Sequence, residues 1–187
     1  MGHIITVSGD LGSGKSTVSR TLSTKLGYKY ISSGAMHRQI AEKMGMNLLE
    51  FNLYAESDPS IDKRVDSTII SLANEAASYV IESRVAWYLL QNSLKVYLVV
   101  ATDVGAKRVM SDTSRLKEPF YSNHADAKAQ LLARKNSENR RFLREYGIDC
   151  SNLRNYDVVI DSTAFTSDLV VEQILSFIGG QRSSRLG

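Results

Sequence analysis

Short apolar runs alternate with longer amphipathic stretches along the whole chain. The short runs are rich in β-branched and aromatic residues and predict strands at Ile4–Val7, Tyr28–Ile31, Tyr79–Glu82, Leu94–Val100 and Tyr156–Ile160. Between them, apolar residues at helical spacing predict helices at Thr17–Leu26, Gly34–Met44, Leu48–Ala55, Ile61–Ala76, Val104–Met110, Ala125–Tyr146 and Ser167–Ile178. This alternation predicts an α/β fold, with a mainly parallel sheet covered by helices on both faces.

The first predicted strand leads directly into a phosphate-binding sequence. Residues 9–16 fill every position of the P-loop pattern, and the flanking strand and helix are the context that this pattern requires. Its glycines leave room for phosphate oxygens, and its N–H groups point at the anion. Lys15 would neutralise the β- and γ-phosphates, and the Ser16 hydroxyl would bind Mg²⁺. The predicted triphosphate site consists of Gly9, Asp10, Leu11, Gly12, Ser13, Gly14, Lys15, Ser16 and Thr17.

Polar residues also follow the other predicted strands. In a parallel sheet, ligands bind at the carboxyl ends of the strands. Arg38 lies one turn into the helix after the second strand, and Arg84 follows the third. Two arginines at the same edge as a P-loop suggest a second anion site beside the triphosphate. The alternative is that they form surface salt bridges, and that the Ser and Asp residues at these positions are ordinary helix caps.

A basic stretch occupies the predicted helix Ala125–Tyr146. Arg134 and Arg141 are seven positions apart, which places them on nearly the same face, about 10 Å from one another. Residues 111–123 precede this helix without an apolar stripe, and Arg115 and Lys117 lie among them. This combination suggests a lid that closes over the phosphates. The alternative is a solvated helix face, with Glu138 paired to Arg134 at the i,i+4 spacing.

Composition restricts the remaining classes. The chain has 187 residues, of which 43% are hydrophobic, and no apolar run approaches the length of a membrane span. Its only cysteine is Cys150, and the N-terminus enters a strand at once, so we expect a cytoplasmic protein without a signal peptide or internal disulfide. The net charge of +3 gives little support to nucleic-acid binding. Residues 181–187, rich in Ser, Gly and Arg, are expected to be a disordered tail.

Several further segments carry a family resemblance. They are Ser32–Arg38, Met46–Phe51, Tyr54–Glu56, Ile61–Asp62, Ile81–Arg84, Tyr146–Asp149 and Tyr156–Asp161. Together with the P-loop, they resemble the cytidylate kinases of the compact archaeal type from about residue 3 to residue 178. The resemblance implies a nucleoside monophosphate kinase fold, with three α/β/α layers around a five-stranded parallel sheet. It also implies a single domain over residues 1–180, a monophosphate-binding segment at about 34–76 and a lid at about 108–145.

The resemblance assigns roles residue by residue. Arg38 and Arg84 match arginines that hold the phosphate of the monophosphate, while Arg134 and Arg141 match lid arginines that meet the transferring phosphoryl group. The acceptor nucleotide would also contact a further set of matching positions, namely Ser33, Gly34, Asp62 and Asp66. Arg108 fits a basic position at the start of the lid.

Three residues depart from the family pattern. Ser83 replaces a common glycine, His37 stands where Phe or Tyr is usual, and Asp10 places a carboxylate in the P-loop. That charge would repel a triphosphate unless a cation offsets it. These departures bear on which acceptor is used.

The implied reaction is ATP + CMP ⇌ ADP + CDP in a monomeric enzyme of pyrimidine metabolism, with dCMP as a further acceptor. Kinases of the same fold that act on UMP, AMP or a small molecule remain an alternative, as does a non-catalytic nucleotide-binding protein. A P-loop GTPase is disfavoured because D-x-x-G and N-K-x-D sequences are missing.

Overall fold

The computed structural model describes residues 2–46, 48–112 and 121–184. Residues 113–120, which include most of the predicted lid loop with Arg115, Lys117 and Pro119, lie outside the described residues, as do residues 185–187 at the end of the predicted tail. Within the described part, no helix has the length and apolarity that crossing a bilayer requires.

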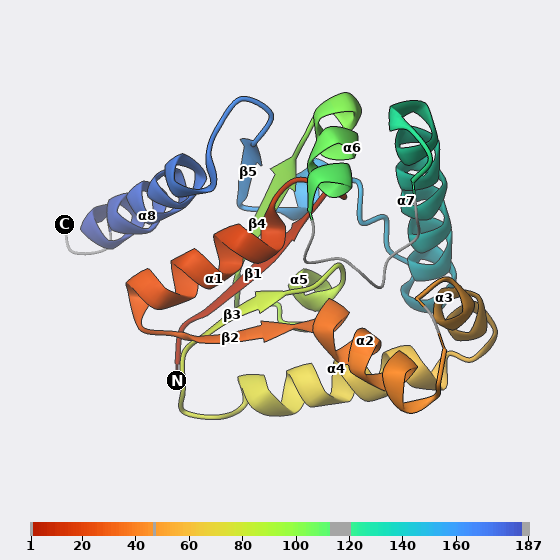
Figure 1. The fold of residues 1–187 in the computed structure, drawn as a ribbon. Coiled ribbons are helices and arrows are strands. Elements are labelled where there is room, and N and C mark those ends of the chain that lie inside the picture. Colours follow the sequence, from red (N-terminus) through yellow and green to blue (C-terminus); the bar gives the residue numbers. More distant parts are fainter. Residues whose placement is uncertain (1, 47, 113–120, 185–187) are drawn as a thin grey trace.

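A five-stranded parallel sheet forms the centre of the fold, in the order β2-β3-β1-β4-β5. The strands are β1 (Ile4–Gly9), β2 (Lys29–Ser32), β3 (Tyr79–Glu82), β4 (Leu94–Val99) and β5 (Val158–Asp161). Each begins and ends within a few residues of its predicted bounds. β1 lies in the middle, paired to β3 on one side and β4 on the other. The predicted fold class is therefore confirmed, and the P-loop leaves the sheet at its central strand (Figure 1).

Helices cover both faces of the sheet. They are α1 (Lys15–Leu26), α2 (Ser33–Lys43), α3 (Leu48–Ser57), α4 (Ser60–Ala73), α5 (Ala86–Leu89), α6 (Thr102–Ser111), α7 (His124–Tyr146) and α8 (Ser167–Ser184), with a 3₁₀-helix at Leu153–Asn155. Helix α8 continues to Ser184, four residues into the segment expected to be disordered. The pattern did not predict α5 or the 3₁₀-helix.

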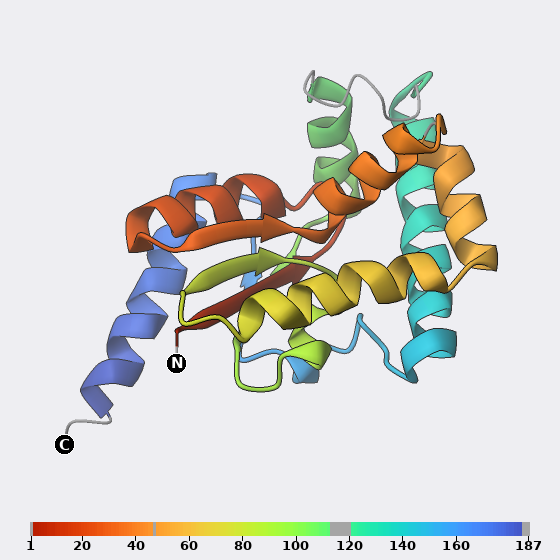
Figure 2. The same cartoon turned by 90° about the horizontal axis from the view of Figure 1, so that it is seen from below.

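Alternating side chains of the strands divide the core between the two faces. On one face, Val80, Val96 and Leu98 pack with α1 and α8. On the other face, Tyr79 and Ile81 pack with α4 and α5, and Tyr97 packs with the end of α7. The helices thus form one layer on each side of the sheet. Both views of the ribbon place α7 beside α3 (Figures 1 and 2), where Arg144 Nη2 donates to the Glu56 carbonyl at 3.0 Å.

Candidate active site

The P-loop connects the end of β1 to the start of α1. Gly12 has a φ of 77°, and a Cβ built on it would lie 2.5 Å from the carbonyl oxygen of Gly105 in α6. Gly14 precedes α1 with a φ of 83°, and a Cβ built there would meet nothing within 4 Å. The glycine at position 12 is needed for close packing of two backbones. The one at position 14 provides the left-handed turn and leaves open space in front of the helix N-terminus.

Lys15 and Ser16 already have partners in the free protein. Lys15 Nζ donates to the Asp10 carbonyl at 2.6 Å, and burial, helped by the charge of Arg84, lowers the pKa of Lys15 to about 7. Ser16 Oγ donates to Glu82 Oε1 at 2.7 Å, and the Tyr30 hydroxyl donates to Glu82 Oε2 at 2.5 Å. Glu82 therefore belongs to the site, although sequence reasoning did not assign it there. The signal was available, because Glu82 is the last residue of the strand that pairs with β1.

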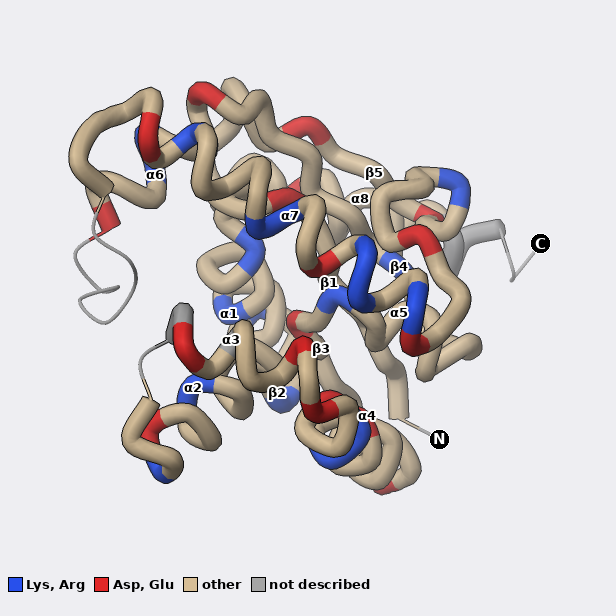
Figure 3. The backbone as a smooth tube through the Cα atoms, turned by 90° about the vertical axis from the view of Figure 1, so that its right-hand side faces the viewer, with Lys and Arg blue, Asp and Glu red and all other residues tan. Residues whose placement is uncertain are grey.

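An open cleft of ≈1620 Å³ connects the P-loop to the second group of predicted site residues. Its lining includes Leu11 to Thr17 of the P-loop and α1, together with Ser33, Gly34, Arg38, Asp62, Asp66, Arg84, Arg108, Arg134 and Arg141. Gly9 and Asp10 are not part of this lining; they lie behind it in the loop. Figure 3 shows basic and acidic stretches gathered around the ends of β1 and β3 and along α7. The four arginines predicted to bind phosphate thus line the same cleft as Lys15.

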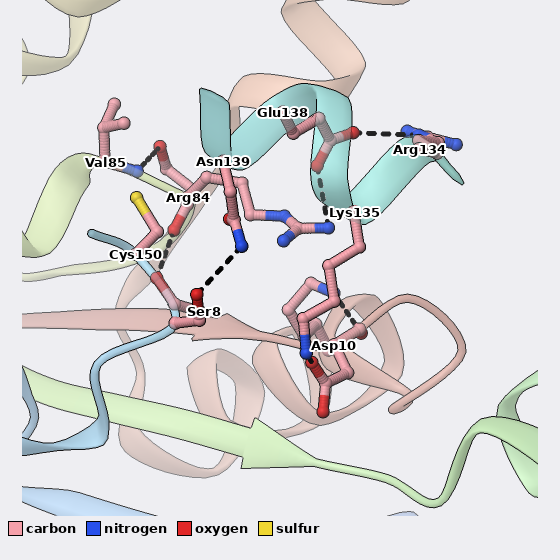
Figure 4. Close-up of polar contacts among 12 residues, drawn as sticks. Ser8, Asp10, Arg84, Val85, Arg134, Lys135, Glu138, Asn139 and Cys150 are labelled. Atoms are coloured by element: carbon pink, nitrogen blue, oxygen red, sulfur yellow. Dashed lines mark hydrogen bonds and ion pairs between the residues drawn. The ribbon is translucent and has the colours of Figure 1, made fainter. Parts of the chain in front are cut away.

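Glu138 of α7 joins two of these arginines. Its Oε2 lies 2.8 Å from Arg84 Nη2, and its Oε1 accepts a hydrogen bond from Arg134 Nε at 2.8 Å (Figure 4). Burial opposes ionisation of Glu138, but the charges of Arg84 and Arg134 outweigh it and lower the pKa of Glu138 to about 2. The expected i,i+4 pair of Arg134 with Glu138 is present. It lies inside the cleft, so it does not mark a merely solvated helix face.

Asp62 pairs with Arg141, another of the four arginines. Its Oδ2 lies 3.3 Å from Arg141 Nε, and its Oδ1 lies 3.1 Å from His37 Nε2. The Tyr146 hydroxyl donates to Asp66 Oδ2 at 2.6 Å. Burial, and to a smaller degree the charge of Asp62, raises the pKa of Asp66. The part of the cleft that α4 lines therefore contains two buried carboxylates.

Arg38 is exposed at the mouth of the cleft, where a Cβ built on Gly34 would lie 3.6 Å from its Nη1. Ser32 caps α2 by accepting from the Ala35 N–H at 3.2 Å, which orients the turn that carries Ser33 and Gly34.

Other predicted residues have different surroundings. Arg108 Nη2 donates to the Ser162 carbonyl at 2.8 Å and so binds the segment after β5. Ser162 Oγ in turn donates to the Ser13 carbonyl at 3.0 Å and supports the P-loop. Asp103, a polar residue that follows β4, is paired with Lys128 at 2.9 Å and does not line the cleft.

The departures at Ser83 and His37 are accommodated locally. Ser83 is buried, its Oγ accepts from the Val85 N–H at 3.3 Å, and its carbonyl accepts from Ser8 Oγ at 2.6 Å. His37 is held by Asp62 and lies 5.9 Å from the Phe51 ring, centroid to centroid. Neither residue blocks the cleft that both help to line.

The strand order, the P-loop and the arginine-lined cleft define a P-loop kinase. Solved structures with this fold include a shikimate kinase from Acinetobacter baumannii (TM-score 0.60, 18% identity, covering 97% of this chain and 95% of that one) and a gluconokinase from Sinorhizobium meliloti (TM-score 0.64, 17% identity, covering 99% and 95%). The chain belongs to the cytidylate kinase-like family, whose sequence model matches residues 4–164.

Curated relatives agree with this membership. The chain is 39% identical to a cytidylate kinase of Sulfurisphaera tokodaii over 94% of its own length and 96% of the relative's. It is 36% identical to a cytidylate kinase of Methanobrevibacter smithii, with 92% and 96% covered. The resemblance inferred from the sequence is confirmed, and it extends over nearly the whole chain.

Proposed function

We propose that this protein transfers the γ-phosphoryl group of ATP to CMP, and also to dCMP. The observation that carries the proposal is the shared cleft, in which a complete P-loop faces four arginines. A triphosphate and a monophosphate can then lie with their phosphates toward one another. The acceptor is taken from the curated relatives, which are named cytidylate kinases.

The donor triphosphate would lie on the P-loop, at the N-terminus of α1. Its charge favours the protonated form of Lys15, whose pKa is about 7 in the free protein. Lys15 Nζ would then exchange the Asp10 carbonyl for phosphate oxygens. Gly14 leaves the space in front of the helix open for this approach.

Ser16 and Glu82 would hold Mg²⁺ together with the phosphates. A hydroxyl and a carboxylate lie 2.7 Å apart there, and both are oxygen donors of the kind that Mg²⁺ prefers. Mg²⁺ in nucleotide sites usually binds through one or two protein oxygens together with substrate phosphates. Mg²⁺ would neutralise charge on the transferring oxygens.

The arginines would act on the acceptor and on the transferring group. Arg38 and Arg84 would hold the monophosphate, and Arg134 and Arg141 would neutralise charge that spreads over the phosphoryl oxygens. A phosphate oxygen of the acceptor is already ionised near neutral pH, so it attacks without a general base. Catalysis then consists of positioning and charge neutralisation.

Incubation with ATP, Mg²⁺ and one monophosphate at a time tests the proposal, with release of ADP as the readout. ADP formation with CMP and dCMP is expected. Turnover with UMP, AMP or GMP alone would identify a different acceptor, and absence of turnover with all five would indicate a nucleotide-binding protein without kinase activity. The variant Lys15→Met serves as the control for contaminating kinases.

We further propose that the protein acts as a cytoplasmic monomer. ATP and CMP are cytoplasmic metabolites, and all the residues assigned to the site come from one chain. Size-exclusion chromatography with light scattering measures the mass in solution. A stable dimer would contradict the monomer.

A further inference from the structure

Asp10 is a carboxylate inside the phosphate-binding loop. It is 8% exposed, does not line the cleft, and places its carboxylate against β4 and the side chain of Lys135. The Tyr97 hydroxyl donates to its Oδ1 at 3.0 Å, and the Val100 N–H donates to its Oδ2 at 3.2 Å. Because Lys15 also donates to its carbonyl oxygen, Asp10 lies directly behind the residue that meets the phosphates.

Lys135 of α7 forms an ion pair with the Asp10 carboxylate. Its Nζ lies 2.6 Å from Asp10 Oδ1, and this contact joins residues that are 125 positions apart in the sequence (Figure 4). Burial of Asp10 opposes its ionisation, but the hydrogen bond and the charge of Lys135 outweigh that effect and lower the pKa of Asp10. Without this counter-ion, the carboxylate behind the loop would repel a bound triphosphate.

The same contact fixes α7 against the loop. Upstream of Lys135, Ala127 and Leu131 of α7 pack with α6 and with Leu11 of the P-loop. Lys135 follows Arg134 directly and lies one turn before Glu138, so the ion pair occurs in the part of α7 that carries the site arginines. Among the residues that the structure describes, this is the ion pair that connects the P-loop to α7.

We propose that Lys135 is the counter-ion of Asp10 in the donor site, and that this pair lets a P-loop with a carboxylate bind ATP while holding α7 in register with the loop. The inference rests on the proposed function only in taking the P-loop as the ATP site. Lys135 is thereby a positioning residue: it acts through Asp10 and does not bind the phosphates.

Titration with ATP tests the proposal without an activity assay. Four proteins are compared with wild type: Lys135→Gln, Asp10→Asn, the double variant and Lys128→Gln. The last is the matched control, because Lys128 lies on the same helix and pairs with Asp103 at 2.9 Å outside the cleft. Titration with CMP and thermal unfolding of each protein separate a specific effect on ATP from a general loss of structure.

Lys135→Gln should weaken ATP binding by about tenfold or more, because it leaves Asp10 buried without a counter-ion. Its affinity for CMP should be unaffected, and Lys128→Gln should match wild type. Adding Lys135→Gln to Asp10→Asn should cost no ATP affinity, because the charge to be offset is already gone. This last comparison stands even if Lys135→Gln alone does not fold.

Two results would overturn the proposal. If the double variant binds ATP much more weakly than Asp10→Asn does, Lys135 binds phosphate directly. If Lys135→Gln binds ATP as wild type does, Asp10 needs no counter-ion. Failure of the wild-type protein to bind ATP would instead refute the proposed function.

Discussion

Replacing Glu138 by Gln tests the charge balance of the cleft. Glu138 is the carboxylate between Arg84 and Arg134, and the side chains of Glu138 and Arg84 are 16% and 14% exposed. Glutamine keeps the shape of the residue but removes its charge, which leaves a buried arginine without its counter-ion. We therefore expect the variant to be less stable than wild type at neutral pH.

The size of the effect follows from the pKa of Glu138, which falls from 4.5 to about 2 on folding. Each unit corresponds to about 1.4 kcal/mol, so the ionised carboxylate stabilises the fold by about 3 kcal/mol at pH 7. Because the pKa is lower in the folded state, this contribution is complete above pH 4.5. It is lost as the pH falls from 4.5 toward 2, where both states are protonated.

Urea unfolding of wild type and Glu138→Gln at several pH values between 7 and 3.5 measures both features. Glu145→Gln is the control on the same helix: Glu145 pairs with Arg144, whose side chain is 58% exposed, and its loss should cost less than about 1 kcal/mol. A difference below about 1 kcal/mol for Glu138→Gln at pH 7 would refute the reasoning. So would a difference that stays the same down to pH 3.5.

Three further predictions concern the site. Arg141→Ala should lower kcat by about 10³-fold or more with little change in ATP affinity, whereas Arg38→Ala should mainly raise the KM for CMP. Steady-state kinetics measures both effects, and an unchanged kcat in Arg141→Ala would contradict the role assigned to Arg141. Gly12→Ala places a Cβ 2.5 Å from the Gly105 carbonyl oxygen, so the loop must shift and ATP binding measured by calorimetry should weaken about tenfold or more. Because the pKa of Lys15 is about 7 in the free protein, ATP binding at pH 8 should be accompanied by uptake of close to one proton. Calorimetry in two buffers of different ionisation enthalpy measures this uptake. No proton uptake would mean that Lys15 is already charged in the free protein.

The sheet and the P-loop could be predicted because their signals are local. A short run of β-branched residues predicts a strand whichever strand it pairs with. The glycines of residues 9–16 are required by the loop's own backbone conformation and by the phosphate in front of it. Helix α5 could not be predicted because its four residues, Ala86–Leu89, are too few to show a helical period. The early end of α4 at Ala73 lies within the uncertainty of any helix boundary read from a sequence.

The residues of the cleft could be predicted individually, but most of their partners could not. Strand ends indicated Arg84, and helical spacing indicated Arg134 and Arg141, because each signal depends on residues near in sequence. The contacts of Glu138 with Arg84 and of Lys135 with Asp10 join segments 54 and 125 positions apart. Such pairs depend on how α7 packs over β3 and the P-loop, which no local pattern determines.

These pairs explain how so many cations can lie together in a cleft that has to fold before substrate arrives. Arginines gathered around one anion site repel one another, and burial makes that repulsion stronger. Glu138 lies between Arg84 and Arg134, 2.8 Å from each, and Asp62 lies 3.3 Å from Arg141. In the P-loop the signs are reversed, because the cation Lys135 pairs with the carboxylate of Asp10. Arg84, Arg134 and Arg141 therefore have carboxylate partners in the free protein, and a bound phosphate has to compete with these partners for the three arginines.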